Sequence, residues 1–322
     1  MNFTVKVPAS TSNLGPGFDT LGLALNLFNE YTFSTDFEEK TDTELIYSSS
    51  LFSEDLPATK DNLVYRSFDY VFKKEGKLTP PIKIHFNAGI PLTGGFGSSS
   101  TAILAGIMAA NEILGKPYDT KQILRIGTQL DGHPDNITPA VLGGFVVCVY
   151  ADSEHNYIKL PWSKDLFFVA ITPDFKVPTA KARAVLPPQI NYQDAVFNVG
   201  YSSLLVAAVA AGDTKALKKA FKDRLHQSYR ASLVPGMSYV LDIGLESGAV
   251  GTMLSGAGST LIAVVDSMEV AKTVAAAMQA AWKQSSINSE YRFLHAAEEG
   301  ARIEYLDRSN GSSIDQRNNF VI

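Results

Sequence analysis

The sequence predicts an α+β fold made of two packed units. Strand and helix patterns mix in both halves of the 322-residue chain without strict strand–helix–strand alternation, and this favours sheets that carry helices on one side. The sequence lacks the Gly-x-Gly-x-x-Gly fingerprint of a dinucleotide-binding sheet, so a doubly wound fold is disfavoured. We expect an N-terminal unit over residues 1–152, a C-terminal unit over 153–307 and a polar tail over 308–322.

The first half opens with strand patterns and continues with helix patterns. Phe3, Val5 and Val7 alternate with polar residues, which is typical of a half-buried strand. Apolar residues at helical spacing follow Asp61 and end before Gly76, a residue type common just past a helix. The other expected strands are 21–27, 31–34, 82–86 and 142–149, and the other expected helices are 99–114 and 120–130.

The second half shows the same mixture of patterns. Residues 151–156 are polar and are expected to form the loop between the two units. The expected strands are 166–171, 250–254, 260–265, 290–295 and 301–306, and the expected helices are 191–211, 214–223, 235–247 and 268–283.

Composition narrows the classes of function. The net charge of −5 gives no support for binding nucleic acid or an anionic membrane surface. No run approaches the roughly 18 uninterrupted apolar residues of a membrane span, and the N-terminus lacks the pattern of a signal peptide. Cys148 is the single cysteine and is expected to be a small core residue. We therefore expect a cytoplasmic protein with no membrane or nucleic-acid partner.

A loop rich in glycine and hydroxyl residues is the strongest chemical signal. Glycines let an anion approach the backbone, the start of the following helix presents free N–H groups, and hydroxyls can donate to phosphate or bind Mg²⁺. The loop has no Lys, which the P-loop motif requires, and a plain turn is the competing interpretation. The candidate phosphate-binding residues are Pro91, Leu92, Thr93, Gly94, Gly95, Phe96, Gly97, Ser98, Ser99, Ser100 and Thr101.

Two polar segments of the first half are candidates for a second binding site. Residues 8–19 follow the first strand, and Asn13 and Asp19 there either cap turns or bind a ligand. The second segment is Gly-His-Pro-Asp-Asn at 132–136. Its Asp and Asn could cap a short helix, whereas a carboxylate and an imidazole this close could hold an ammonium group or accept a proton.

The second half contributes two arginines and a glycine turn. Arg183, which follows Thr179, and Arg230 are natural bidentate partners of a carboxylate, although either could instead form a surface salt bridge. Gly256 lies in the glycine-rich link at 255–258, for which a hairpin turn is the competing interpretation.

In their order along the chain, these segments resemble the motifs of the GHMP small-molecule kinases. The family is named for galactokinase, homoserine kinase, mevalonate kinase and phosphomevalonate kinase. Its three motifs match residues 8–19, 91–101 and 255–260, and the resemblance extends to about residue 307. Within the family, Pro-Ala-Ser-Thr-Ser-Asn-Leu-Gly-Pro-Gly-Phe-Asp at 8–19 and His-Pro-Asp-Asn at 133–136 resemble the homoserine kinase branch.

The resemblance implies a fold and an activity. The N-terminal unit would be like the second domain of ribosomal protein S5, the C-terminal unit would be ferredoxin-like, and ATP would bind between them. The implied reaction is the Mg²⁺-assisted phosphorylation of the side-chain hydroxyl of L-homoserine by ATP in threonine biosynthesis. Relatives are often homodimers, so a homodimer is possible here.

The resemblance also implies residue roles. Backbone amides of residues 95–99 would hold the β-phosphate, Ser98 or Ser99 would reach Mg²⁺, and Asn62 would line the adenine pocket. The implied acceptor site consists of Asn13, Asp19, His133, Asp135, Thr179, Arg183, Arg230 and Gly256. Asp135 would be the general base, or it would bind the ammonium group while Asn136 orients the hydroxyl.

Three departures from the family pattern stand out. The family usually carries a Glu metal ligand on the helix before the acceptor loop, where this chain ends the helix pattern at Asp131. Asp131 could replace that Glu, or Gln129 could act through a water molecule. Ser259 replaces a usual Pro. In the glycine loop, Phe96 replaces a usual Leu, and Ser100-Thr101 replaces a usual Ala-Ala, with small expected effects. The competing functions are another GHMP kinase, such as a mevalonate-type enzyme, and a catalytically silent nucleotide sensor.

Overall fold

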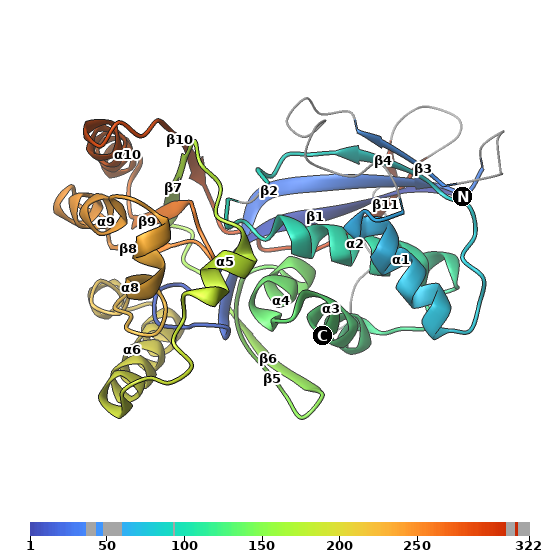
Figure 1. Cartoon of the computed structure of the whole chain (residues 1–322), viewed down its shortest axis with the longest axis horizontal. Helices are drawn as coiled ribbons and strands as arrows, with labels where there is room; N and C mark the ends of the chain where they lie inside the picture. The colour runs from blue at the N-terminus through green and yellow to red at the C-terminus, as the bar shows by residue number, and fades with distance from the viewer. Residues whose placement is uncertain (37–42, 48–59, 93, 307–312, 315–322) are drawn as a thin grey trace.

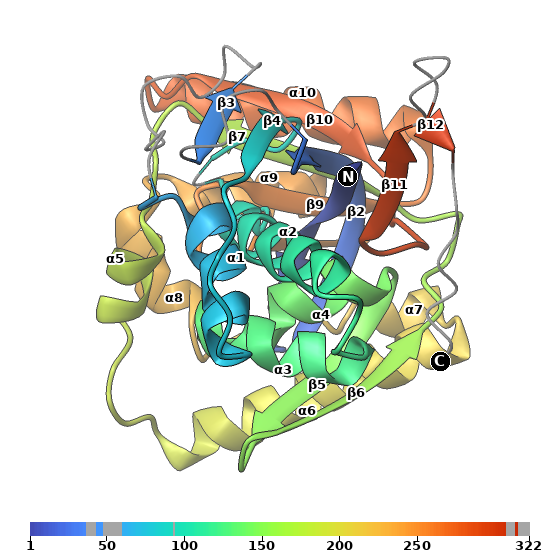
Figure 2. The same cartoon turned by 90° about the vertical axis from the view of Figure 1, so that its right-hand side faces the viewer.

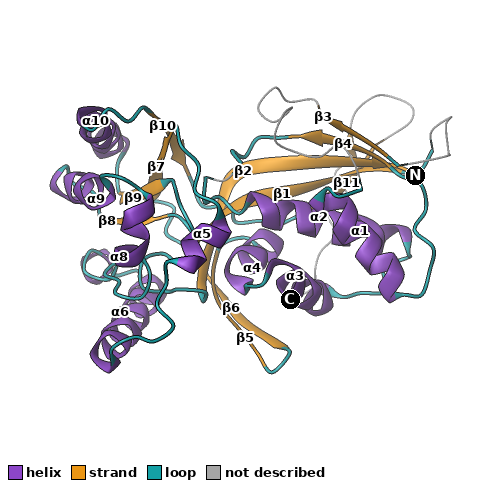
Figure 3. Ribbon diagram, viewed as in Figure 1, coloured by secondary structure: helices purple, strands orange, loops and turns teal. Residues whose placement is uncertain are grey.

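The computed structural model describes residues 1–36, 43–47, 60–92, 94–306 and 313–314, and they form two sheets covered by helices (Figures 1 and 3). The larger sheet has the strand order β12-β11-β1-β2-β4-β3, and β2 also pairs with β5, which pairs with β6. Its strands are β1 (Asn2–Ser12), β2 (Leu21–Ser34), β3 (Glu44–Tyr47), β4 (Lys83–Asn87), β5 (Phe145–Ala151), β6 (Glu154–Leu160), β11 (Arg302–Leu306) and β12 (Ser313–Ile314).

Four helices cover one side of the larger sheet (Figure 1). They are α1 (Leu63–Lys74), α2 (Ser98–Ile113), α3 (Thr120–Asp131) and α4 (Pro134–Leu142). Local signals define their starts: the Asn62 side chain accepts the Val64 N–H at the start of α1, and Asp119 and Gln122 form a capping box at the start of α3. Phe3, Phe33 and Phe68 are fully buried in the core between this sheet and its helices.

The smaller sheet has the strand order β10-β7-β9-β8. Side chains alternate across its strands, so Val169 and Ile171 of β7 pack against α9 and α10, whereas Phe168 and Ala170 face the opposite side. Its strands are β7 (Phe167–Pro173), β8 (Gly251–Leu254), β9 (Leu261–Val265) and β10 (Ser289–Leu294). The helices of this half are α5 (Thr179–Ala184), α6 (Tyr192–Ala211), α7 (Thr214–Leu217), α8 (Gln227–Arg230), α9 (Met237–Glu246) and α10 (Met268–Gln284), with a 3₁₀ turn at Ala231–Leu233.

A shared apolar core joins the two sheets. Leu21 and Leu23 at the start of β2 and Phe96 from the glycine loop pack in one buried cluster with Phe168 of β7 and Met253 of β8. The segment between β1 and β2 and the turn between β8 and β9 are therefore held at fixed positions beside one another. This junction is where the candidate motifs meet.

The element predictions are mostly confirmed, with four corrections. The expected strands 21–27 and 31–34 form one strand, β2, and the expected helix 214–223 is the short α7. Residues 151–156 are not a loop between units: β5 and β6 form a hairpin whose turn residues, Asp152 and Ser153, have φ of 53° and 63°. The larger sheet also includes β6 and β11, which lie beyond residue 152. Most of the expected tail, 308–322, lies outside the described residues.

One described helix, α6, meets the length and composition of a membrane span, with a mean hydropathy of 1.4. Only 22% of that segment is buried. Its polar residues Asp194 and Asn198 are tied to the rest of the fold through Arg224 and the Pro16 carbonyl. The sequence did not predict that so much of this apolar helix would be exposed.

His155 of β6 ties the hairpin to the helices that carry the candidate site. Its Nδ1 and Nε2 atoms lie 3.3 Å and 3.0 Å from the hydroxyls of Thr128 on α3 and Thr138 on α4. Burial lowers the pKa of the ring to about 4. The ring is therefore neutral in the folded protein at pH 5, whereas it takes up a proton in the unfolded chain.

We expect this difference to make acid destabilise the fold through His155. The stabilisation is fully present above about pH 6.5 and is lost as the pH falls toward 4. The loss in unfolding free energy has reached about 2 kcal/mol at pH 5. Urea unfolding at pH 7 and pH 5 measures it. His155→Gln should show a smaller loss of unfolding free energy between these pH values than the wild type, while His295→Gln, at an exposed site, should behave as the wild type. Equal losses in all three proteins would contradict this account of His155.

Candidate active site

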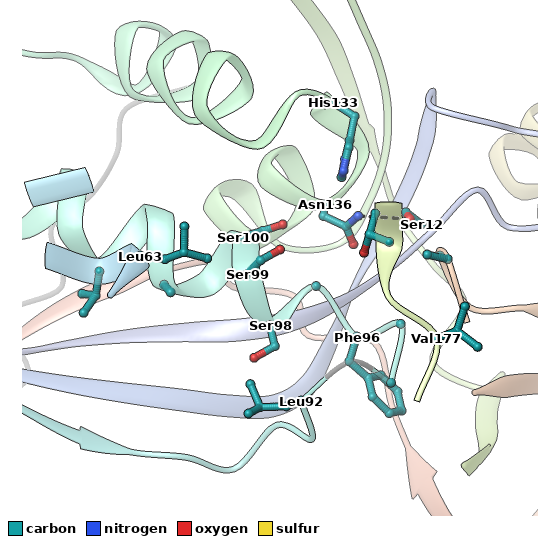
Figure 4. A pocket seen from close by; sticks show the side chains of 18 of the residues that line it. Ser12, Leu63, Leu92, Phe96, Ser98, Ser99, Ser100, His133, Asn136 and Val177 are labelled. Atoms are coloured by element: carbon teal, nitrogen blue, oxygen red, sulfur yellow. Dashed lines mark hydrogen bonds between the residues drawn. The ribbon is translucent and has the colours of Figure 1, made fainter. Parts of the chain in front are cut away.

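A cavity of about 360 Å³ lies where both sheets and the N-terminus of α2 meet (Figure 4). The predicted site residues that line it are Asn13, Asp19, Asn62, Leu92, Gly94, Gly95, Phe96, Gly97, Ser98, Ser99, Ser100, His133, Asp135, Asn136, Thr179, Arg183, Arg230 and Gly256. Residues from the first and last thirds of the chain therefore face one space, and most of the predicted site is brought together.

The glycine loop is pressed between parts of both sheets. The Phe96 carbonyl accepts the N–H of Ser10 on β1, and the Gly95 carbonyl accepts the hydroxyl of Ser255 after β8. At Gly95 (φ 84°) a Cβ atom would lie 2.2 Å from the Ser255 carbonyl oxygen, and at Gly97 (φ 67°) it would lie 2.4 Å from the Ser10 hydroxyl. Only glycine fits these two positions, both for backbone conformation and for space.

The loop ends where α2 begins. Gly97 is the N-cap of α2, and Ser98, Ser99 and Ser100 form its first turn beside the cavity (Figure 4). The first N–H groups of a helix have no partner within the helix and carry partial positive charge. A 16-residue helix that starts at the cavity wall is therefore suited to hold an anion there.

Two of the serines contact the end of α3. The Ser100 hydroxyl donates to Asp131 Oδ2 at 2.6 Å, and the Ser99 hydroxyl donates to Asp131 Oδ1 at 3.4 Å. Burial raises the pKa of Asp131, although the charge of His133 and these hydrogen bonds act in the opposite direction. Ser99 and Asp131 thus form an oxygen-rich pair at the N-terminus of α2.

The start of α4 carries a histidine–carboxylate pair. His133 is the N-cap of α4, and its Nδ1 lies 2.9 Å from Asp135 Oδ1, which is almost fully buried. Burial lowers the pKa of His133. The hydrogen bond and charge of Asp135 and the charge of Asp131 raise this pKa by a larger amount, so the net shift is upward. The ring is thereby held against a carboxylate that faces the cavity.

Asn136 joins this helix to β1. Its Oδ1 accepts the Ser10 hydroxyl at 2.9 Å, and its Nδ2 donates to Ser12 Oγ at 3.1 Å (Figure 4). Both ends of the amide are therefore engaged by one strand, and this fixes how α4 presents Asp135. Asp135 and Asn136 are the second and third residues of α4, not its cap.

The segment between β1 and β2 brings another carboxylate, that of Asp19, to the cavity. Asn13 and Asp19 have φ of 72° and 54°, and the Asp19 N–H donates to Asn13 Oδ1 at 3.1 Å. The Asp19 carboxylate accepts two hydrogen bonds, of 3.0 Å and 2.8 Å, from the Arg183 guanidinium on α5. This hydrogen bonding is the main reason that the pKa of Arg183 is raised. Thr179 is exposed at the start of the same short helix.

Arg230 shares the Phe18 ring with Arg183 and is almost fully buried. Its guanidinium donates to the carbonyl oxygens of Ala182 and Gly256 at 3.1 Å and 2.9 Å, and Asn13 Nδ2 donates to the same Gly256 carbonyl. Burial and the nearby Arg183 charge lower its pKa to about 10. Two guanidinium groups therefore face one end of the cavity.

The other end of the cavity is largely apolar. Its lining there includes Leu45, Ile46, Leu63, Ile84 and Phe86 beside Asn62. The sequence did not reveal this wall, because apolar residues on a strand or helix give the same signal whether they face a core or a pocket. Ser12 and Val177 also line the cavity and were missed: Ser12 lies within the 8–19 motif but carried no distinct chemical signal there, and Val177 is one of many apolar residues. The buried His226, which does not line the cavity, was missed as well.

Some predicted site residues lie elsewhere. Pro91, Thr101 and Asp131 are not among the lining residues, and Thr93 lies outside the described residues. Thr101 is fully buried: its hydroxyl lies 2.9 Å from Asn29 Nδ2 and 3.1 Å from the Tyr31 hydroxyl on β2. Thr101 thus anchors α2 to the sheet.

The described residues contain no group of three or more His, Cys, Asp or Glu side chains that could hold a metal ion alone. Ser99 and Asp131 instead fit a cation of the Mg²⁺ type, which is usually held by one or two carboxylates together with the phosphates of a substrate. The arrangement can therefore bind a polyphosphate at α2 and a small molecule with both charge signs at Asp19, Arg183 and Arg230.

Comparisons with known proteins agree with this geometry. The family model described as the GHMP kinases N terminal domain matches residues 62–144, and the GHMP kinases C terminal model matches residues 205–284. The chain is 40% identical to a homoserine kinase of Synechococcus sp. over 94% of this chain and 98% of that protein. It is 38% identical to a homoserine kinase of Crocosphaera subtropica over 93% and 97% of the two chains.

Solved structures give the same result. The crystal structure of homoserine kinase from Cytophaga hutchinsonii matches with a TM-score of 0.83 and 28% identity, covering 94% of this chain and 97% of that one. A mevalonate kinase from Methanococcus jannaschii matches with a TM-score of 0.67 and 14% identity over 92% and 98% of the two chains. At this identity the match shows a shared fold only. The chain belongs to the GHMP kinases and, within them, to the homoserine kinase family.

Proposed function

We propose that this protein transfers the γ-phosphoryl group of ATP to the side-chain hydroxyl of L-homoserine. ATP as the donor follows from membership of the kinase family. The observation that carries the choice of acceptor is one cavity with a helix N-terminus on its wall and two arginines and an aspartate at one end. Homoserine is a zwitterion and needs a partner for each charge, whereas an acceptor without a carboxylate would bring no anion to the half-exposed Arg183 or the buried Arg230.

The Asp19–Arg183 pair suggests how the amino acid is held. In the structure these two side chains satisfy each other through two hydrogen bonds. A zwitterion can take over both partners, with its ammonium group on Asp19 or Asp135 and its carboxylate on Arg183 and Arg230. Thr179, His133 and the Gly256 turn would complete this pocket around the side chain.

The reaction needs alignment and charge neutralisation more than covalent help from the protein. The homoserine oxygen attacks the γ-phosphorus, the bond to the β-phosphate oxygen breaks, and ADP leaves. We assign Asp135 as the base that takes the hydroxyl proton, with His133 and Asn136 fixing its position; an alternative is that Asp135 binds the ammonium group and the phosphate accepts the proton. Backbone N–H groups of residues 95–99 would stabilise charge on the phosphates.

Mg²⁺ would lie at Ser99 and Asp131, with Ser98 as an alternative hydroxyl ligand. When bound, the ion would neutralise phosphate charge during transfer. A buried carboxylate whose pKa is raised by burial gains from a nearby cation, so this pair fits that ion. Asn62 and the apolar wall around Leu63 would hold the adenine.

The first test is ADP release from Mg-ATP with a panel of alcohols. L-homoserine should give the highest kcat/KM, because only it fills both charge sites. Removing its carboxylate, as in 3-aminopropan-1-ol, should lower kcat/KM by about a hundredfold or more, since the two guanidinium groups lose their partner. A preference for mevalonate, or no ADP release with any alcohol, would overturn the proposed function.

The second test concerns Asp135. Asp135→Asn should lower kcat by about tenfold or more, because the amide cannot accept the proton. Steady-state kinetics with L-homoserine measure this, and Asp165→Asn, at an exposed carboxylate, serves as the matched control. A kcat and a homoserine KM for Asp135→Asn that both equal those of the wild type would remove Asp135 from both of its proposed roles.

The third test concerns the metal. Asp131→Asn should raise the Mg²⁺ concentration needed for half-maximal rate by about tenfold or more, because the pair loses its charged oxygen. The measurement is the initial rate after EDTA treatment and titration with Mg²⁺, again with Asp165→Asn as the control. An unchanged Mg²⁺ titration would place the metal ligand elsewhere.

We further propose that the protein forms a homodimer through α6. The exposed stripe of this helix carries Tyr192, Val196 and Val199 in its first half, and the small residues Ser203, Ala207 and Ala210 in its second half. Two copies packed antiparallel about a two-fold axis near residue 201 would set each large side chain against a small one. Such self-complementarity is what a two-fold interface requires, and α6 lies on the outside of the molecule in Figures 1 and 2.

The two-fold pairing places Val199 opposite Ser203 of the second copy. Val199→Asp and Ser203→Lys should each weaken the dimer, because each buries a charge without a partner. Mixing the two variants should restore a dimer with one ion pair across the axis. Light scattering after size-exclusion chromatography measures the mass. A wild-type monomer, or association with lipid vesicles in place of dimers, would contradict the proposal.

A further inference from the structure

We propose that His226 is a positioning residue that sets both Arg230 and the segment between β1 and β2 for binding the acceptor amino acid. The inference rests on the proposed function, because it concerns the pocket assigned to the acceptor. His226 lies at the N-cap of α8, is fully buried, and does not line the cavity. It can therefore affect the substrate only through its neighbours.

The two ring nitrogens of His226 bind two different parts of the acceptor pocket. Nε2 lies 2.8 Å from the carbonyl oxygen of Gly15, in the segment that carries Asp19. Nδ1 lies 3.2 Å from Nη1 of Arg230. The imidazole thus bridges the carboxylate-bearing segment of the first half of the chain and the buried guanidinium of the second half.

The chemistry of these partners assigns the protons. A guanidinium only donates hydrogen bonds, so Nδ1 must accept, and a carbonyl only accepts, so Nε2 must carry the hydrogen. His226 is therefore neutral, with its proton on Nε2. Burial lowers the pKa of the ring, which agrees with the neutral form that the contacts require.

The backbone around His226 is fixed by a buried carboxylate. Asp223 Oδ2 accepts the N–H groups of His226 and Gln227 at 3.1 Å and 2.7 Å, and Oδ1 accepts the Leu225 N–H at 3.0 Å. The distance from Asp223 Oδ2 to His226 Nε2 is 3.7 Å, beyond a hydrogen bond. Asp223 therefore orients the backbone of this turn, while the ring contacts Gly15 and Arg230. Arg230 lies one helical turn after His226.

Phe18 extends the same contact to the second arginine. Its ring stacks on the His226 imidazole with centroids 5.3 Å apart, and the guanidinium carbons of Arg230 and Arg183 lie 5.2 Å and 5.8 Å from its centroid. A shift of the imidazole would therefore displace the aromatic support of both guanidinium groups and of the adjoining Asp19. Within the part of the chain that the structure describes, the ring contacts of His226 go to Gly15, Arg230 and Phe18 and not to the apolar end of the cavity.

Protonation of His226 would reverse the favourable contact with Arg230. A hydrogen on Nδ1 would face a guanidinium that also donates, and it would add a like charge. The charged groups that act on the ring are Asp223 and Arg230 from its own segment and Asp19 from the segment between β1 and β2. The two carboxylates raise the pKa of the ring less than burial and Arg230 lower it. We therefore expect protonation at low pH to weaken acceptor binding through this ring.

Three substitutions separate the two hydrogen bonds. The His226→Asn side chain places an acceptor near the Nδ1 position and can still serve Arg230, whereas the His226→Gln side chain can place a donor near Nε2 and serve Gly15. His226→Leu removes both contacts, and His295→Leu, at an exposed position, is the matched control. Near-ultraviolet circular dichroism and the melting temperature establish that each variant is folded.

Steady-state kinetics of the full-length proteins with L-homoserine and Mg-ATP test the inference. His226→Leu should raise the KM for homoserine by about tenfold or more, with changes of less than about threefold in kcat and in the KM for ATP. His226→Asn should recover most of the loss. The homoserine KM of the wild type and of the His295→Leu control should rise as the pH is lowered. The homoserine KM of His226→Asn should rise less than that of the control over the same pH range.

The outcomes distinguish this inference from the proposed function. An inactive wild type would overturn the proposed function and the substrate named here. An active wild type with an unchanged homoserine KM in His226→Leu and His226→Gln would overturn the role of His226 alone. If His226→Leu fails to fold, a homoserine KM equal in His226→Gln and the wild type overturns that role as well. Equal losses in kcat and in both KM values would mark His226 as a purely structural residue.

Discussion

The structure depends on the close approach of the glycine loop to backbone from both sheets. Gly95 lies against the carbonyl of Ser255 and Gly97 lies against Ser10, at distances where a Cβ atom does not fit. These contacts place the N-terminus of α2 beside the junction of the two sheets. Because that junction also holds Asp19, Arg183 and the turn at Gly256, one packing constraint brings the proposed anion site and the proposed amino-acid site into a single cavity.

Electrostatics at this cavity are local. The chain has a net charge of −5, yet the proposed anionic donor and zwitterionic acceptor would both find partners, because the N-terminus of α2 and two guanidinium groups line the same cavity. The buried carboxylates Asp131 and Asp135 balance this positive potential around His133. Phosphoryl transfer needs such fixed charges more than it needs a covalent participant, so packing that holds them in place contributes directly to the rate.

Local patterns in the sequence predicted the elements well where the chain carries its own signals. Helical periodicity predicted α1, α2 and α3, Gly76 marked the end of α1, and the glycine loop marked the start of α2. The hairpin of β5 and β6 was missed because polar turn residues look alike in a hairpin and in a linker. The strand that became β11 was expected to belong to the C-terminal unit, but it pairs with β1 in the larger sheet. Pairing between strands so distant in sequence is set by the tertiary fold.

The candidate site divides in the same way. Residues within a recognisable motif, such as Asp19, Asp135 and Arg230, were predicted from the sequence and line one cavity. Thr101 sits in the same motif but points to β2, because a helix directs successive residues to different faces. His226 has no motif of its own, and its importance arises only from what surrounds it.

The most direct measurement of the central claim is a crystal structure of the protein with a non-hydrolysable ATP analogue and L-homoserine. We expect polyphosphate oxygens within hydrogen-bond distance of the N–H groups of residues 95–99, with the homoserine carboxylate on Arg183 and Arg230 and its hydroxyl facing the γ-phosphate. Polyphosphate bound away from the N-terminus of α2, or a homoserine carboxylate that touches neither arginine, would contradict the claim.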